Sequence, residues 1–287
     1  MAPITVFDLQ QAIAGGELAL AYQPEVDLRT GHITAVEALA RWTHPVHGPV
    51  PPTEFIPLAE RAGYISDISL VVVRTAVAQA AEWSRSRWDG GPLPIWVNLS
   101  ACELADPRLH GRIMSALETT DVAAGQLGIE ITETVPMTDT ARAASTLRAL
   151  QADGIRVAID DFGTGYSSIA HLKQLPVDVI KIDRSFVAGV AKEGTDASIV
   201  ASMIEMAHAM HRQVIAEGVE DAVQQRVLAE IGCDLGQGYL FARPQPPCGI
   251  DNLLAADRQL AAFPPLPAPQ VKLPRPRAAA DAAQRVS

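Results

Sequence analysis

Six short and otherwise apolar segments of this sequence each carry a polar or charged residue at or near the C-terminal end. An unpaired charge is costly to bury in an apolar strand. One such residue would be an exception within a core, whereas six at matching positions indicate a common site. They are Glu37 in TAVEAL, Asn98 in IWVNLS, Glu130 in LGIEIT, Asp160 and Asp161 in VAIDDFG, Lys181 in VIKID and Glu217 in VIAEG.

The chemistry that this set favours is oxygen ligation of divalent cations. Five carboxylates that converge repel one another, and a bound cation removes that conflict. The seven histidines and three cysteines are scattered, so the donors favour Mg²⁺ or Mn²⁺ over Zn²⁺ or Cu²⁺. The Asp160-Asp161 doublet can bridge two ions if the chain turns at the strand end. Two ions about 3.5–4 Å apart commonly serve attack on a phosphodiester. For Glu37 alone, an exposed strand-end acid is the alternative.

Lys181 is unusual because the chain uses four lysines against nineteen arginines. It lies two residues before Asp183, which places both side chains on one face of a strand. A compact ammonium suits a point contact to a water or a phosphate oxygen. A salt bridge to a neighbouring acid is the alternative.

The segment Asp161–Ser168, DFGTGYSS, is a glycine-bearing loop that opens a predicted helix. It lacks the spacing of a GxGxxG or Walker motif. We therefore interpret it first as a mobile loop beside the cations and only second as a phosphate cradle.

The elements that must position these residues alternate between strand and helix patterns. Two strands joined at Arg29–Gly31 predict an antiparallel hairpin, and a βα rhythm follows. Eight strands with mostly helical crossovers predict a TIM-like (β/α)₈ barrel with an antiparallel first strand, whose C-terminal mouth would carry the site. The predicted strands are 17–28, 33–39, 94–99, 127–132, 156–160, 178–182, 213–217 and 237–241, and the predicted helices include 52–62, 67–83, 109–119, 141–152, 167–173, 196–210 and 221–231.

Composition limits the possible partners and the location. The chain has 287 residues, is 48% hydrophobic and carries a net charge of −10, so duplex nucleic acid is not expected as a partner. The sequence contains neither a long apolar run nor a signal peptide, and it has three unclustered cysteines, which predicts a cytoplasmic protein without a membrane span. Six of the 21 prolines lie between Pro264 and Pro276, and residues 263–287 are expected to form a disordered tail after a domain over residues 1–262.

Together, these segments resemble the EAL-domain cyclic di-GMP phosphodiesterases over residues 5 to 258. Besides Glu37-Ala38-Leu39 with Arg41, the motifs are AYQPEVDL, VNLSA, IEITET, DDFGTGYSSIAHLKQLPVDVIKIDRSFV, VIAEGVE and GQGYLFARP. Glu25 and Ala40 depart from the family pattern, which more often has an aliphatic residue and leucine there. No sensor or GGDEF domain fits in the chain, so we expect the domain to stand alone.

The resemblance implies a role for each matching position. Two Mg²⁺ or Mn²⁺ ions would be held by Glu37, Asn98, Glu130, Asp160, Asp161 and Glu217. Lys181 would contact the attacking water, Gln237 would lie near it, and Glu133 would steady the DFGTGYSS loop. The substrate contacts would be Gln23, Leu39, Arg41, Asp183, Glu220 and Tyr239.

The implied reaction is hydrolysis of cyclic di-GMP to linear pGpG. A catalytically silent cyclic di-GMP receptor of the same fold is the first alternative, and a metal-dependent barrel enzyme for another phosphodiester is the second. Family members commonly dimerise around the DFGTGYSS loop, so a homodimer through Asp161–Leu175 is expected.

Overall fold

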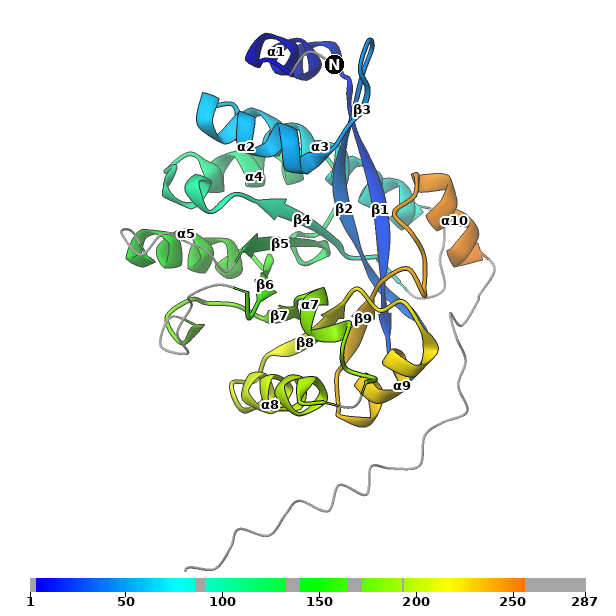
Figure 1. Cartoon of the computed structure of the whole chain (residues 1–287). Coiled ribbons are helices and arrows are strands. Elements are labelled where there is room, and N and C mark those ends of the chain that lie inside the picture. The colour runs from blue at the N-terminus through cyan, green and yellow to red at the C-terminus, as the bar shows by residue number, and fades with distance from the viewer. Residues whose placement is uncertain (1–3, 86–90, 133–139, 165–171, 193, 256–287) are drawn as a thin grey trace, which may run out of the picture.

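The protein is a closed barrel of eight strands surrounded by helices (Figure 1). The computed structural model describes residues 4–85, 91–132, 140–164, 172–192 and 194–255. The barrel order is β1-β2-β4-β5-β6-β7-β8-β9, and the short strand β3 (Gly48–Val50) extends β2 outside it. The barrel strands are β1 (Leu18–Asp27), β2 (Ile33–His44), β4 (Ile95–Leu99), β5 (Leu127–Thr132), β6 (Arg156–Phe162), β7 (Val179–Ile182), β8 (Gln213–Glu217) and β9 (Leu235–Gln237).

One strand runs against the others, which confirms the predicted (β/α)₈ barrel with an antiparallel first strand. β1 pairs antiparallel with both β2 and β9, whereas every pairing from β2 through β4 to β9 is parallel. The C-terminal ends of seven strands therefore meet at one mouth of the barrel.

The helices lie outside the barrel. Helix α1 ends at Gly15 and is followed by Gly16, whose φ of 71° suits a residue without a Cβ. Helix α9 begins after Asp221, whose carboxylate accepts hydrogen bonds from the N–H groups of Val223 and Gln224. The α-helices are α1 (Val6–Gly15), α2 (Pro52–Ala62), α3 (Ile65–Arg85), α4 (Leu109–Glu118), α5 (Thr140–Ala152), α7 (Arg184–Val187), α8 (Asp196–Ala209), α9 (Ala222–Glu230) and α10 (Pro247–Ala255), and the 3₁₀ helices are η1 (Ala101–Ala105) and η2 (Ala124–Gln126).

The last strand differs from the prediction, which placed it over residues 237–241. In the structure, β9 ends at Gln237, which is the residue at which the predicted strand begins. The chain then turns against Val219: the Val219 N–H donates to the Gln237 carbonyl at 3.0 Å, and the Leu240 N–H donates to the Val219 carbonyl at 3.0 Å. A Cβ on Gly238 would lie 2.1 Å from the Val219 carbonyl oxygen, so this close approach requires glycine.

Two predicted regions cannot be compared with the structure. The predicted helix 167–173 falls mostly outside the described residues, as does the whole tail from residue 263, including the domain boundary before it. Within the described part of the chain, no helix is long and apolar enough to cross a lipid bilayer.

The barrel interior has an apolar layer directly beneath the polar residues of the mouth. Six buried side chains form a separate cluster there, and each lies two residues before a polar residue of the same strand, on the same face. The cluster is Ala35, Trp96, Ala158, Val179, Ile215 and Leu235, and the polar residues above it are Glu37, Asn98, Asp160, Lys181, Glu217 and Gln237.

Trp96 fills this layer, and Gly128 makes room for it. A Cβ on Gly128 would lie 2.1 Å from Cε3 of Trp96. The Arg156 guanidinium lies 5.4 Å from the centre of the indole ring. The apolar layer therefore closes the barrel below the site, and its packing depends on one glycine.

We expect Gly128→Ala to lower the free energy of unfolding by about 3 kcal/mol, because overpacking a close-packed core forces side chains off their rotamers. Urea unfolding would measure the change. Gly111→Ala is the matched control, because its Cβ would meet nothing within 4 Å and lies in helix α4. That control should be neutral or stabilising. A loss in Gly128→Ala no larger than in the control would show that Trp96 does not need this gap.

Candidate active site

The two adjacent aspartates reach the barrel mouth because β6 bulges where they stand. Ile159 pairs with Ile180 and Phe162 with Ile182, so two residues on β6 oppose the single Lys181 on β7. Asp161 has φ = 54°, an uncommon value for a residue with a side chain. The Asp161 N–H donates to Asp160 Oδ1 at 2.8 Å. The bulge thus directs both carboxylates to the same side of the sheet.

Lys181 is the central cation of the site and is fully buried. Its Nζ lies 2.9 Å from Glu130 Oε2, 2.7 Å from Glu217 Oε1 and 3.4 Å from Glu37 Oε2. The alternative of a salt bridge to barrel acids is therefore realised in this structure, with three acids rather than one. Burial alone would lower the pKa of Lys181, but Glu130, Glu217 and Glu37 raise it well above its usual range, so the ammonium stays charged.

Glu37 is held by two amide side chains. Asn98 Nδ2 donates to its Oε1 at 2.6 Å, and Gln237 Nε2 donates to its Oε2 at 2.6 Å. Burial would raise the pKa of Glu37, but Lys181 and these two N–H donors outweigh it, and the pKa lies below its usual value. Glu37 is therefore fixed in place as an ionised carboxylate.

Three other acids of the site, Glu130, Glu217 and Asp161, have raised pKa values, which means that their surroundings disfavour the anionic form. Burial and the neighbouring acids raise the pKa of Glu130 well above its usual range despite Lys181. Burial raises the pKa of Glu217 to about 8. Burial, Asp160 and Asp183 raise the pKa of Asp161. A site that holds these groups as anions needs additional positive charge.

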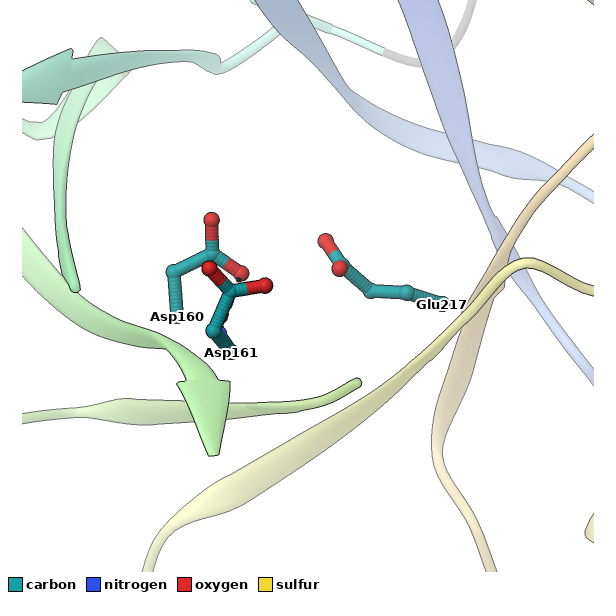
Figure 2. A group of neighbouring side chains, drawn as sticks. All are labelled: Asp160, Asp161 and Glu217. Atoms are coloured by element: carbon teal, nitrogen blue, oxygen red, sulfur yellow. Dashed lines mark hydrogen bonds between the residues drawn. The ribbon is translucent and has the colours of Figure 1, made fainter. Parts of the chain in front are cut away.

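The geometry of three of these acids suits a cation. Oxygen atoms of Asp160, Asp161 and Glu217 lie within 4.8 Å of one another. Figure 2 shows the two aspartate side chains from β6 facing the carboxylate of Glu217 from β8. Oε1 of Glu130 is buried without a hydrogen-bond partner among the described residues, so a further oxygen is unsatisfied there. An oxygen-only donor set of this kind fits Mg²⁺ or Mn²⁺.

Two adjoining clefts reach the acids. The larger has a volume of about 600 Å³, and the smaller about 240 Å³. Leu39 and Asp160 line both clefts, so they stand between them. The larger cleft is lined by Arg41, Asn98 and Asp161 among apolar residues of α2 and α3, and the smaller by Gln23, Glu37, Glu217, Glu220, Gln237 and Tyr239.

The family comparison agrees with this geometry. A family model described as "EAL domain" matches residues 7–244. The chain belongs to the EAL domain family.

Curated relatives of this EAL domain are longer proteins. The bifunctional diguanylate cyclase/cyclic di-GMP phosphodiesterase MucR of Pseudomonas aeruginosa is 40% identical over 251 residues, which cover 87% of this chain and 36% of MucR. A cyclic di-GMP phosphodiesterase of the same organism is 38% identical over 247 residues, which cover 86% of this chain and 42% of that protein. This chain therefore spans well under half of the length of either relative.

Solved structures show the same fold. The MucR phosphodiesterase in complex with c-di-GMP matches with a TM-score of 0.80 at 38% identity, covering 85% of this chain and 98% of that one. The agreement confirms the barrel architecture predicted from the strand pattern.

The remaining predicted site residues of this EAL domain fall into three groups. Asp183 caps α7, and its Oδ1 accepts from the Ser185 N–H at 3.0 Å, so its carboxylate has a structural partner. Arg41 donates from Nη1 to the Ala40 carbonyl at 2.9 Å, and the Tyr239 ring lies under Arg243 at 4.1 Å. Glu133 lies outside the described residues.

Glu25 is a buried acid to which the sequence interpretation assigned no role. It is fully buried, and its position opposite Gln237 in the β1–β9 ladder turns its side chain into the barrel. The signal available from the sequence was its spacing of two residues from Gln23 on β1, which places both on one face.

The stability of the metal-free EAL domain should fall as the pH rises from about 4.5 to about 8, because the folded pKa of Glu217 is raised from 4.5 to about 8. The folded state then binds more protons than the unfolded chain within this window. A cation held by these acids would compete with those protons, so a rise in melting temperature on adding Mg²⁺ should be larger near pH 8 than near pH 6. Thermal unfolding at both pH values tests this, with Glu217→Gln as the variant that cannot titrate. An equal rise at both pH values would contradict the expectation.

Proposed function

We propose that this EAL domain hydrolyses one phosphodiester bond of cyclic di-GMP and releases linear pGpG. The observation that carries the proposal is that two adjoining clefts share Asp160 and are both lined by acids of the site. A cyclic dinucleotide has two nucleoside halves joined by phosphates, so each half would have a cleft and a phosphate would lie at the acids that both clefts share. The names of the MucR relative and of its ligand complex support this substrate.

A phosphate cannot approach these acids unless cations bind first, because like charges repel. Two Mg²⁺ or Mn²⁺ ions would be held by Glu37, Asn98, Glu130, Asp160, Asp161 and Glu217. When bound, such ions activate water and neutralise phosphate oxygens. The fit is supported by the oxygen-only donor set, by the 4.8 Å grouping of three acids and by the unpartnered Oε1 of Glu130.

The chain's own residues supply orientation and charge. Lys181 Nζ lies within 3.4 Å of carboxylate oxygens of Glu37, Glu130 and Glu217, so its ammonium would contact a water bound among these acids. Gln237 fixes Glu37 through its Nε2, and Arg41 faces the larger cleft, where its guanidinium would meet a phosphate. Glu220 and Tyr239 would bind one base in the smaller cleft.

The decisive experiment incubates the purified protein with cyclic di-GMP and Mg²⁺ or Mn²⁺ and follows pGpG by chromatography. We expect turnover with either ion, loss of turnover in excess EDTA, and recovery when the ion is restored. Binding of cyclic di-GMP without any pGpG would support the receptor instead. Undiminished hydrolysis in excess chelator would exclude the two-cation site.

Three further expectations belong to this proposal. The enzyme would act in the cytoplasm, where unclustered cysteines stay reduced. It would form a homodimer through Asp161–Leu175, a segment of which residues 165–171 lie outside the described chain, and light scattering would test this. Glu133 would hold the DFGTGYSS loop, so Glu133→Ala would lower turnover and Mg²⁺ affinity together.

A further inference from the structure

The barrel interior contains a carboxyl group that the proposed chemistry does not use. Glu25 on β1 is 0% exposed, and among the described residues no donor meets hydrogen-bond geometry at either of its carboxyl oxygens, with the Trp96 indole as the nearby polar group. A buried, ionised and unpartnered carboxylate is one of the most costly groups in a protein. Its presence in the apolar layer therefore requires a compensating interaction.

Gln237 is a buried residue near Glu25 whose side-chain carbonyl oxygen lacks a hydrogen-bond donor in the described part of the chain. It lies directly opposite Glu25 in the antiparallel β1–β9 ladder, so the two side chains are neighbours on the inner face. Nε2 of Gln237 donates to Glu37 Oε2 at 2.6 Å and to Gln23 Oε1 at 3.3 Å. Its Oε1 is buried and has no donor among the described residues.

Only one orientation of the Gln237 amide is compatible with an ionised Glu37. Rotating the amide by half a turn would place its carbonyl oxygen at the 2.6 Å contact with Glu37 Oε2, where two acceptors repel. Oε1 must therefore receive its hydrogen bond from another group. An ionised Glu25 offers only acceptors, whereas a protonated Glu25 offers one O–H donor.

We propose that Glu25 is a positioning residue that keeps its proton and donates it in a hydrogen bond to Oε1 of Gln237. This bond fixes the amide with Nε2 toward Glu37, and so holds Glu37 ready to bind a cation. One proton thereby satisfies two buried groups that would otherwise be unpaired.

The charges around the site agree with a neutral Glu25. Lys181 from β7 favours the anion, as do Arg156 from β6 and the Trp96 indole from β4 more weakly, whereas Glu37 from β2 disfavours it. Glu130 from β5 also interacts with Glu25 and disfavours its charge. Burial outweighs them and raises the pKa of Glu25 to about 7. A hydrogen bond donated by the neutral form raises it further.

Infrared spectroscopy of the full chain can detect this proton directly, because a protonated carboxyl group has a carbonyl-stretching band that a carboxylate lacks. Spectra of the wild type and of Glu25→Gln are compared with and without Mg²⁺. We expect a band that the substitution removes and that Mg²⁺ does not, since Mg²⁺ ionises only its own ligands. Glu103→Gln is the control: Glu103 is a buried acid on η1 with Ser69 Oγ donating to it at 2.7 Å, and its loss should leave that band in place.

Mn²⁺ affinity, followed by electron paramagnetic resonance, tests the positioning role. Glu25→Gln keeps an N–H donor without charge and should retain the wild-type affinity, whereas Glu25→Leu leaves Gln237 unpaired and should weaken it about tenfold. The proposal is wrong if Glu25→Gln removes no band, if it weakens Mn²⁺ binding as much as Glu25→Leu does, or if Glu25→Leu binds Mn²⁺ normally. The band does not depend on substrate or cation, so its absence is distinct from a failure of the proposed reaction.

Discussion

Lys181→Met is expected to lower the turnover of cyclic di-GMP by about 10³-fold, the scale for removing a group that stabilises charge in a transition state. Lys181 is the buried cation among Glu37, Glu130 and Glu217, with contacts of 2.7–3.4 Å. Its loss leaves these carboxylates without a compensating charge in the metal-free protein. We therefore also expect the free energy of unfolding of that form to fall by about 3 kcal/mol.

The same variant should bind Mg²⁺ at least as tightly as the wild type, because a competing positive charge has been removed from the acids. Steady-state rates and Mg²⁺ titrations together separate loss of chemistry from loss of cation. Lys173→Met is the matched control, because Lys173 is exposed. Lys181→Arg should not restore activity, since a planar guanidinium does not fit a fully buried ammonium site. A rate near that of the wild type in Lys181→Met would remove Lys181 from the mechanism.

Glu37→Ala is expected to lower turnover by at least about 10²-fold. Glu37 accepts hydrogen bonds from Asn98 and Gln237 and keeps its pKa below the usual value. It can therefore bind a cation without first losing a proton. Its removal leaves the acids on β6 and β8 in place but deletes the proposed cation ligand on β2.

The fold of Glu37→Ala should survive, because deleting one of several repelling acids relieves charge in the metal-free protein. Circular dichroism and Mn²⁺ titration would show a folded protein with weakened cation binding. Glu118→Ala, at the exposed end of α4, controls for the general loss of a negative charge. Normal turnover and normal Mn²⁺ affinity in Glu37→Ala would mean that Glu37 is only an acid at a strand end.

The order of the elements could be read from local sequence. Strands 127–132 and 213–217 and helix 52–62 have the predicted bounds, because buried strands and amphipathic helices leave apolar patterns over four or more residues. The boundary of β9 could not be read in this way. It depends on how closely Gly238 approaches Val219, and these residues are distant in sequence.

The sequence by itself determined which residue types converge at the mouth, since polar residues at the ends of parallel strands must meet once the sheet closes. Only the tertiary structure decided how they pair. The β6 bulge sets Asp160 and Asp161 opposite Lys181, and the strand register sets Glu25 opposite Gln237. The packing of Trp96 against Gly128 likewise depends on the β4–β5 pairing. Register and bulges are fixed by closure of the whole barrel, and a local pattern with a period of two residues carries no information about which strand lies beside it.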